Sequence, residues 1–393
     1  MRKILIISPK KHVGFDTLAP FIVNLGKCKF DIKTIFFHDI DLKEIKKIPM
    51  YYNAVNANST ILFRKYSTKQ YIKSIYIILW ILFNRNPTVI MFNNSMNSII
   101  LVKILYFLSK LKGKYYVMHN YNSPTNKSFI REFYIHSPKD ELKREIIWKD
   151  KHKIIGFTSN NYPGKLLSYT KYEDFRSDIF CLPKERVYLG YPKLNDRWKD
   201  YVSSINLFDS EDIKKSNEIV VILTKKPLVP YFHKNEKIPR KILLESIYAI
   251  REIYPKILIV VKPKPVRSKD GNDWVDDTVL SIEDKRVIVD YTPAPLLAKK
   301  AKFVVSNART TAYFDFLINE TPCIEYSEYS DEYYFVHPKT KFMSDFGVLH
   351  ITKESNLINA IESISNKTFR CVPVDKIRSM LQDGKFKFNC GLI

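Results

Sequence analysis

Short runs of apolar residues recur along the chain, and most are followed by a segment with helical periodicity. Residues 3–8, 88–92 and 115–118 are such runs in the first half. Runs this short, with hardly a polar residue inside them, are typical of strands buried on both faces of a parallel sheet. The other elements expected in this half are strands at 32–37, at 153–158 and around residue 186, and helices at 16–25 and 98–110.

A second series of the same kind begins at residue 218, after a charged and polar connection over residues 199–217. Its expected elements are strands at 218–223, 256–261, 286–289, 302–306 and 321–326, and helices at 240–253, 295–300 and 312–319. A chain of 393 residues is too long for one ordinary core. We therefore predict an α/β protein with two Rossmann-like, doubly wound domains facing each other across a cleft. The expected boundaries are 1–200 and 201–365, with 366–393 packing back on the domains.

The chain is strongly basic, with a net charge of +23. Such an excess fits contact with phosphate on a nucleotide, on nucleic acid or on an anionic membrane. An AT-rich genome explains it equally well, because Lys, Asn, Ile and Tyr are abundant together while only 10 Gly occur. No Cys/His cluster has the spacing of a metal site, and no signal peptide or membrane-spanning run is apparent. We therefore expect a cytoplasmic protein.

Phosphate recognition is expected without a glycine-rich loop, because neither GxGxxG nor GxxxxGK[ST] occurs. Helix N-termini and cationic side chains are the remaining phosphate ligands. The best candidate turn lies between a buried strand and an expected helix, and it holds Ser306, Asn307, Arg309, Thr310 and Thr311. The alternative is that Thr310 or Thr311 is only a helix N-cap.

A second candidate lies where the strand at 256–261 runs into Lys262-Pro-Lys-Pro. The prolines restrict the backbone and present Lys262 and Lys264 at the carboxyl end of the strand, where open α/β sheets bind ligands. A solvated basic turn is the alternative. Glu325, near the end of the last strand, is a candidate acceptor of ribose hydroxyl groups or a surface carboxylate.

Several segments, in the same order and spacing, resemble the CDP-glycerol glycerophosphotransferases and related capsule-polysaccharide transferases. They are Met118-His-Asn-Tyr-Asn-Ser-Pro, Val187-Tyr-Leu-Gly-Tyr-Pro-Lys-Leu-Asn-Asp, Lys262-Pro-Lys-Pro, Ser306-Asn-Ala-Arg-Thr-Thr, Tyr313-Phe-Asp-Phe-Leu, Thr321-Pro-Cys-Ile-Glu-Tyr and Asp331-Glu-Tyr-Tyr. The resemblance covers residues 115–335 and implies a GT-B fold with the donor nucleotide on the C-terminal domain. Two departures, Lys264 in place of the family's histidine and Asn-Ala-Arg-Thr-Thr in place of Asp-Tyr-Ser-Ser, put glycerol phosphate in doubt. Bacterial transferases that use CMP-activated Kdo, sialic acid or related nonulosonic acids have a comparable His-Pro segment and a Ser/Thr pair, and this resemblance favours a CMP-activated sugar acid as the donor.

The resemblance implies a transferase of bacterial surface polysaccharide synthesis, with capsule and lipopolysaccharide as candidate products. Its partners are a nucleotide-activated sugar donor and a glycan or lipid-linked acceptor. The resemblance also implies a histidine base, which is His119 here; Asp16, also a candidate helix N-cap, and Glu132 are alternative bases. Cationic side chains would stabilise the leaving phosphate, so we expect no cofactor and no obligatory metal.

Two other classes remain as alternatives, a nucleotide-sugar epimerase and a basic nucleic-acid-binding protein; no nucleic-acid-binding motif is found, so nucleic acid is not an expected partner. Residues 64–85, which are basic and aromatic, are interpreted as a core helix with lysines at its ends. The alternative is a surface that rests on the anionic inner face of the plasma membrane.

Overall fold

The structure is a computed structural model. It describes residues 1–9, 12–26, 28–64, 68–92, 99–118, 164–168, 185–224, 237–264, 273–308, 310–329 and 344–382. The chain divides into two compact units. The first is Met1–Tyr201 together with the segment from Arg378, and the second is Val202–Ile377. The strand expected at 153–158 lies outside the described residues.

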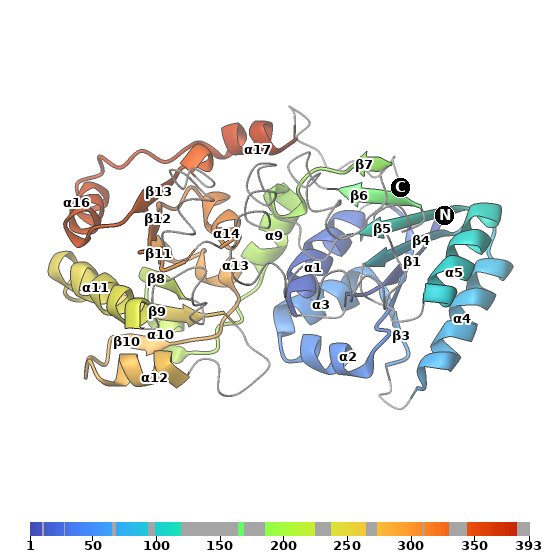
Figure 1. Ribbon diagram of the computed structural model, residues 1–393, viewed down its shortest axis with the longest axis horizontal. Coiled ribbons are helices and arrows are strands. Elements are labelled where there is room, and N and C mark those ends of the chain that lie inside the picture. Colours follow the sequence, from blue (N-terminus) through green and yellow to red (C-terminus); the bar gives the residue numbers. More distant parts are fainter. Residues whose placement is uncertain are drawn as a thin grey trace, which may run out of the picture. The chain divides into compact units, whose positions relative to one another are not determined.

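The first unit is built on a parallel sheet of seven described strands in the order β3-β2-β1-β4-β5-β6-β7 (Figure 1). The strands are β1 (Lys3–Ile7), β2 (Asp31–Ile35), β3 (Thr60–Leu62), β4 (Thr88–Phe92), β5 (Lys114–Met118), β6 (Lys165–Ser168) and β7 (Arg186–Tyr188). All five residues of β4 and four of the five in β1 are buried. This burial explains why the central strands are continuous apolar runs.

Helices cover both faces of this sheet (Figure 1). They are α1 (His12–Gly26), α2 (Asp39–Lys46), α3 (Pro49–Asn58), α4 (Gln70–Phe83) and α5 (Ile99–Lys112). Helix α9 (Asp196–Ser204) contacts α3, where the Trp198 ring stacks on Tyr51. Helices α4 and α5 pack side by side on one face, where Ile77 and Leu105 join Leu5, Val89 and Val117 in one core. Among the described residues, no helix is long and apolar enough to span a membrane.

The second unit repeats this plan with a parallel sheet of six described strands in the order β10-β9-β8-β11-β12-β13. The strands are β8 (Ile219–Thr224), β9 (Leu258–Pro263), β10 (Val287–Val289), β11 (Ala301–Ser306), β12 (Cys323–Tyr326) and β13 (Val348–Ile351). In each sheet the first strand of the unit lies between the second and the fourth. This is the strand order of a Rossmann fold. The first three strands are added towards one edge of the sheet, and the fourth strand is added on the other side of the first.

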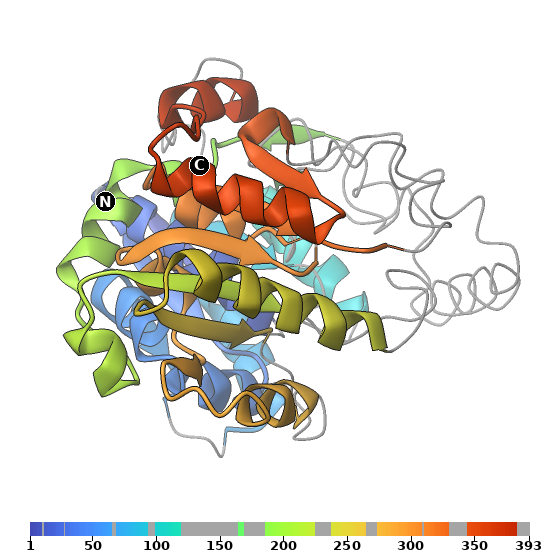
Figure 2. The ribbon, with the colours of Figure 1, turned by 90° about the vertical axis from the view of Figure 1, so that its left-hand side faces the viewer.

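Helices also lie on both faces of the second sheet (Figure 1). One face is covered by α11 (Lys237–Ile253), α12 (Asp273–Leu280) and α16 (Glu354–Ser365). In Figure 2, α11 and α16 lie in front of the strands. Buried residues recur along α11 at helical spacing, for example Ile238, Ile242 and Ile250, and they face the strands. The short helices α13 (Ala294–Leu297) and α14 (Tyr313–Leu317) lie on the opposite face.

Several predicted boundaries are wrong, although the predicted fold class is confirmed. Helix α1 begins at His12, so Asp16 lies inside it, neither in a loop nor at an N-cap. Helices α13 and α14 are shorter than the predicted 295–300 and 312–319. The expected connection at 199–217 holds the end of α9 and the short helix α10 (Glu211–Lys215). The charged residues of this connection that lie in α9 and α10 face solvent, and Asp209 lies between the two helices.

Candidate functional site

One row of mostly polar residues crosses the carboxyl edge of the second sheet. The register pairs Lys262 with Leu223, Leu223 with Ser306, Ser306 with Glu325, and Glu325 with His350. Paired residues of a parallel sheet lie on the same face, because side chains alternate along every strand. We call Lys262, Ser306, Glu325 and His350 the polar row.

The polar row lies on the face opposite α11. The residues that flank it in sequence, Val261, Val305, Ile324 and Ile351, pack into the core with α11 and α16. The row must therefore face the side on which α13 and α14 lie (Figure 1). Lys262, Ser306 and Glu325 are each at least nine-tenths buried. Buried polar groups at the carboxyl edge of a Rossmann-like sheet mark the edge where such sheets bind ligands.

Glu325 is the most firmly held carboxylate of the row. It is 5% exposed, and its Oε1 accepts a hydrogen bond from the Tyr329 hydroxyl at 2.9 Å. Nδ1 of His350 lies 3.1 Å from the same oxygen, and the rings of Tyr329 and His350 stack. Among the described residues Oε2 accepts no hydrogen bond. One oxygen thus fixes the carboxylate, and the other remains as an acceptor. The alternative that Glu325 is a surface carboxylate is wrong.

Lys262 lies near carboxylates of its own domain. Its amine donates to the Tyr291 carbonyl at 3.3 Å, just beyond β10. Asp290 begins the same segment and is buried, and its Oδ1 accepts from the Thr292 backbone N–H. Burial raises the pKa of the Asp209 carboxyl, and the Asp290 carboxylate raises it further, whereas the amines of Lys262 and Lys214 lower it. Lys262 therefore offsets negative charge on the β10 side of the sheet.

The turn after β11 lies where the sheet reverses its strand order, between β8 and β11. Ser306 ends β11, and its hydroxyl donates to the Ala308 carbonyl at 2.5 Å. The Thr310 hydroxyl accepts from the Ala312 backbone N–H at 3.2 Å, and Thr311 is partly exposed. Helix α14 begins only at Tyr313 and has five residues, so few aligned peptide dipoles reinforce this turn. The predicted phosphate role of the turn therefore depends on its hydroxyl and backbone groups more than on a helix dipole, and it stays a prediction.

Asn307 lies on the other side of the sheet from the polar row. Its Nδ2 donates to the Ser246 Oγ of α11 at 3.0 Å, and its backbone N–H donates to the Leu223 carbonyl at 2.9 Å. The Ser246 hydroxyl donates in turn to the Ile242 carbonyl, which leaves its oxygen free to accept from Asn307. These contacts attach the turn to α11. The structure therefore separates the side chain of Asn307 from that of Ser306.

Of the two predicted lysines, Lys262 does not point towards the 306–311 turn. Lys262 lies on β9, and its amine faces β10 on one side of that strand. The turn follows β11, which lies on the other side of β9, beyond β8. Lys264 is exposed, and its backbone N–H donates to Thr224 at the end of β8. Arg309, His119 and Glu132 lie outside the described residues. Their predicted roles stay predictions.

In the first unit, Asp16 is engaged by two partners. Lys193 Nζ lies 2.7 Å from Oδ2, and the Tyr51 hydroxyl donates to Oδ1 at 2.7 Å. Lys193 is 6% exposed and follows the turn at Gly190, whose φ of 88° favours glycine. Because both oxygens are bonded within the unit, this arrangement favours a structural role over that of a general base.

Four residues of these clusters were missed by reasoning from the sequence: Tyr329, His350, Lys193 and Tyr51. Lys193 belongs to the Gly-Tyr-Pro-Lys segment that carries the family resemblance, which was its only signal. His350 is flanked by an exposed Leu349 in an edge strand, so no buried run marks its position.

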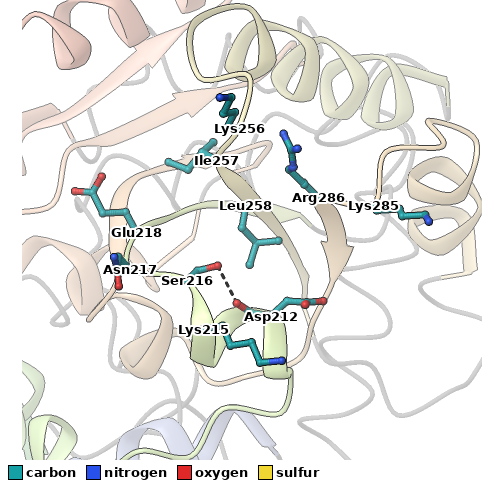
Figure 3. Close-up of a pocket in the computed structure, with 10 residues that line it drawn as sticks. All are labelled: Asp212, Lys215, Ser216, Asn217, Glu218, Lys256, Ile257, Leu258, Lys285 and Arg286. Atoms are coloured by element: carbon teal, nitrogen blue, oxygen red, sulfur yellow. Dashed lines mark hydrogen bonds between the residues drawn. The ribbon is translucent and has the colours of Figure 1, made fainter.

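A hollow of about 460 Å³ opens at the opposite, amino edge of the second sheet (Figure 3). It is lined by residues that precede or begin β8, β9 and β10, including Asn217, Leu258 and Arg286. The amines of Lys256 and Lys285 point in different directions and meet at no common point (Figure 3). We therefore assign the candidate site to the carboxyl edge, where buried polar groups converge.

No family model matches the sequence, and no curated protein matches it. Solved structures match almost the whole chain. A putative UDP-N-acetylglucosamine 2-epimerase from Listeria monocytogenes is 12% identical, with a TM-score of 0.51, over 98% of this chain and 93% of that one. Phytolacca americana UGT2, solved with UDP-2fluoro-glucose and pterostilbene, is 9% identical, with a TM-score of 0.51, over 97% of this chain and 94% of that one. CalG4, the calicheamicin glycosyltransferase, is 10% identical, with a TM-score of 0.45, over 98% and 94%.

The chain therefore has the GT-B type of fold, with two Rossmann-like domains built on parallel sheets. Identities of 9% and 12% show the fold alone. The more specific resemblance to CDP-glycerol and capsule transferases stays a prediction.

Proposed function

We propose that the protein is a glycosyltransferase that moves a sugar from a nucleotide-activated donor to a hydroxyl group of a glycan or lipid-linked acceptor. Glu325 carries the proposal. Its carboxylate is buried at the carboxyl edge of the second sheet, fixed through Oε1 by Tyr329 and His350. A fixed carboxylate with a remaining acceptor oxygen suits the hydroxyl groups of a ribose. The GT-B fold supports this class of activity.

The other proposed roles follow the positions of the side chains. Ser306, Thr310 and Thr311 lie at the strand-order reversal and would contact the departing phosphate, with Arg309 and Lys264 adding positive charge. Lys262 and Asn307 would act indirectly, since one offsets nearby carboxylates and the other attaches the turn to α11.

The proposed general base is His119, with Glu132 as the alternative. An imidazole suits this step because it titrates near neutral pH. Asp16 is the weakest candidate, because Lys193 and Tyr51 already bond both of its oxygens.

The proposed donor is a CMP-activated sugar acid, and the proposed product is a bacterial surface polysaccharide made at the cytoplasmic face of the membrane. The family resemblance supports both, and it keeps CDP-glycerol as the alternative donor. No divalent ion is required in this proposal, so a chelator should leave turnover unchanged.

An epimerase of nucleotide sugars is a second candidate, because the Listeria structure named as a putative epimerase shares the fold. The two activities differ in their need for an acceptor. Incubation with nucleotide sugar alone should leave the sugar configuration unchanged if the protein is a transferase, whereas an epimerase would convert the sugar.

The first test is nucleotide binding, measured by thermal shift and calorimetry with CMP, CDP, UDP and GDP. We expect a cytidine nucleotide to raise the melting temperature most, and Glu325→Gln to weaken its binding about tenfold to a hundredfold, as loss of a hydrogen bond to a charged group does. Glu252→Gln, on the exposed side of α11, is the matched control. A preference for UDP or GDP would exclude the CMP donor, and unchanged binding in Glu325→Gln would remove the ribose role.

A further inference from the structure

The layer formed by α4 and α5 exposes many large apolar side chains. On α4 these include Phe83 at 83% exposure and Ile75 at 53%, and on α5 Ile100 at 69% and Phe107 at 61%. We call the full set the apolar face: Tyr71, Ile72, Ile75, Leu79, Leu82, Phe83, Ile100, Ile104, Phe107 and Leu111. The face is independent of the candidate site described above, which lies in the second unit.

The apolar face is continuous along both helices. The exposed residues of α5 recur at positions 100, 104, 107 and 111, and those of α4 at 71, 72, 75, 79, 82 and 83, which is helical spacing. The opposite sides of both helices pack on the same sheet, through Ile77 and Ile81 of α4 and Leu105 of α5. Figure 1 shows the two helices side by side, so their outward sides form one surface.

The exposed area is large for a protein that is covered only by water. With about 200 Å² for each fully exposed large side chain, the apolar face presents roughly 1,000 Å². The largest apolar patch on a typical monomer is about 300–600 Å². A face of this size indicates a partner that removes it from water.

The exposed charges on α4, on α5 and at the ends of these two helices are all positive. Residues 45–131 contain no Asp or Glu, and the layer carries five exposed cations, Lys69, Arg85, Lys103, Lys110 and Lys112. Among the described residues none of these five forms an ion pair. Lys103 and Lys110 lie within the apolar stripe of α5, so their aliphatic stems extend along it with the amines at its surface.

We propose that the apolar face docks on the surface of an anionic lipid bilayer, with its aliphatic and aromatic side chains in the headgroup region and its lysines on the lipid phosphates. Interfacial helices combine these two properties, an apolar side and flanking cations. Pairing with a second copy would bring two sets of positive charge together with no acid between them. Nucleic acid offers no apolar surface of this size to cover the aliphatic side chains.

The test is co-sedimentation of the full chain with vesicles of phosphatidylcholine alone or with added phosphatidylglycerol. We expect binding to the anionic vesicles that weakens as salt is raised, because screening acts on the lysines. Ile104→Ser with Phe107→Ser should abolish binding, and Lys103→Glu with Lys110→Glu should weaken it at least about tenfold. The control is Tyr248→Ser with Leu280→Ser, which removes two exposed apolar side chains from the second unit.

Melting temperature and nucleotide binding, measured on the same variants, separate this proposal from the proposed function. Both should be unchanged in Ile104→Ser with Phe107→Ser, because exposed side chains of the first unit are removed. The proposal is overturned if the wild-type chain does not bind anionic vesicles at low salt, or if the control pair weakens binding as much as the α5 pair. It is also overturned if the chain is a dimer that the α5 pair makes monomeric.

Discussion

The ion pair between Asp16 and Lys193 allows a structural role to be separated from a catalytic one. In Asp16→Ala the Lys193 amine, now 2.7 Å from Oδ2, would lose its carboxylate partner while remaining in a site where it is only 6% exposed. The Tyr51 hydroxyl would lose its acceptor as well. The substitution therefore removes the carboxylate partner of a nearly buried charge and the acceptor of a partly buried hydroxyl.

The magnitude follows from how far water reaches the pair. Removal of one partner from a fully buried ion pair costs about 3–5 kcal/mol, whereas an exposed pair contributes about 0–1 kcal/mol. The Asp16 side chain is 33% exposed, so water enters on one side, and we expect a cost of about 2–3 kcal/mol. The lost Tyr51 hydrogen bond adds about 1 kcal/mol.

The assay is urea unfolding followed by tryptophan fluorescence, since Trp198 stacks on Tyr51 and reports on this cluster. Lys193→Met and the double variant Asp16→Ala with Lys193→Met complete the cycle. We expect the double variant to be more stable than Asp16→Ala alone, because it no longer contains a nearly buried amine that has lost its carboxylate. A loss below about 0.5 kcal/mol in Asp16→Ala would refute the argument. If Asp16→Asn keeps its stability and loses turnover, Asp16 is the base.

Two further predictions concern buried polar groups. Burial raises the pKa of Tyr201 to about 12, so its neutral form stabilises the folded chain fully below pH 10 and less as the pH rises towards 12. Tyr201→Phe should reduce this alkaline loss of stability, measured by urea unfolding across that pH range. At neutral pH it should lower the free energy of unfolding by about 1 kcal/mol, because the hydrogen bond to the Met50 carbonyl is lost. If the loss of stability at alkaline pH is unchanged in the variant, Tyr201 is not the source of that loss. Asn307→Ala should lower the free energy of unfolding by about 1–2 kcal/mol. Adding Ser246→Ala to this variant should cause little further loss of stability, because both substitutions remove the same contact. Fully additive losses would show that the two side chains act separately.

The central strands could be predicted from the sequence, because a strand buried on both faces is a continuous run of apolar residues. The strand at 88–92 is found at the predicted residues, β8 differs from prediction by one residue at each end, and β11 begins one residue earlier than predicted. The edge strand β13 was missed, because Leu349 and His350 are exposed or partly exposed and break the run. An edge strand has one neighbour, so its residues need not be apolar.

The candidate site was predictable only in part, because its contacts join residues distant in sequence. The pattern at 302–311 predicts a strand followed by a polar turn at a sheet edge, and the structure places both there. Nothing local indicates that Glu325 meets His350, 25 residues later, or that Asp16 meets Lys193, 177 residues later. These pairs are created by strand order and helix packing.

At the end of β11, the side chains of two consecutive residues point to opposite faces of the sheet. Ser306 lies on the side of α13 and α14, while Asn307 is drawn into the packing of α11. A small molecule at this strand end can reach only one of these two side chains, so any contact that it makes with the other residue must come from the peptide backbone. Alanine scanning would detect few of those contacts, whereas replacing the amide itself, by proline or by an ester analogue, would reveal them.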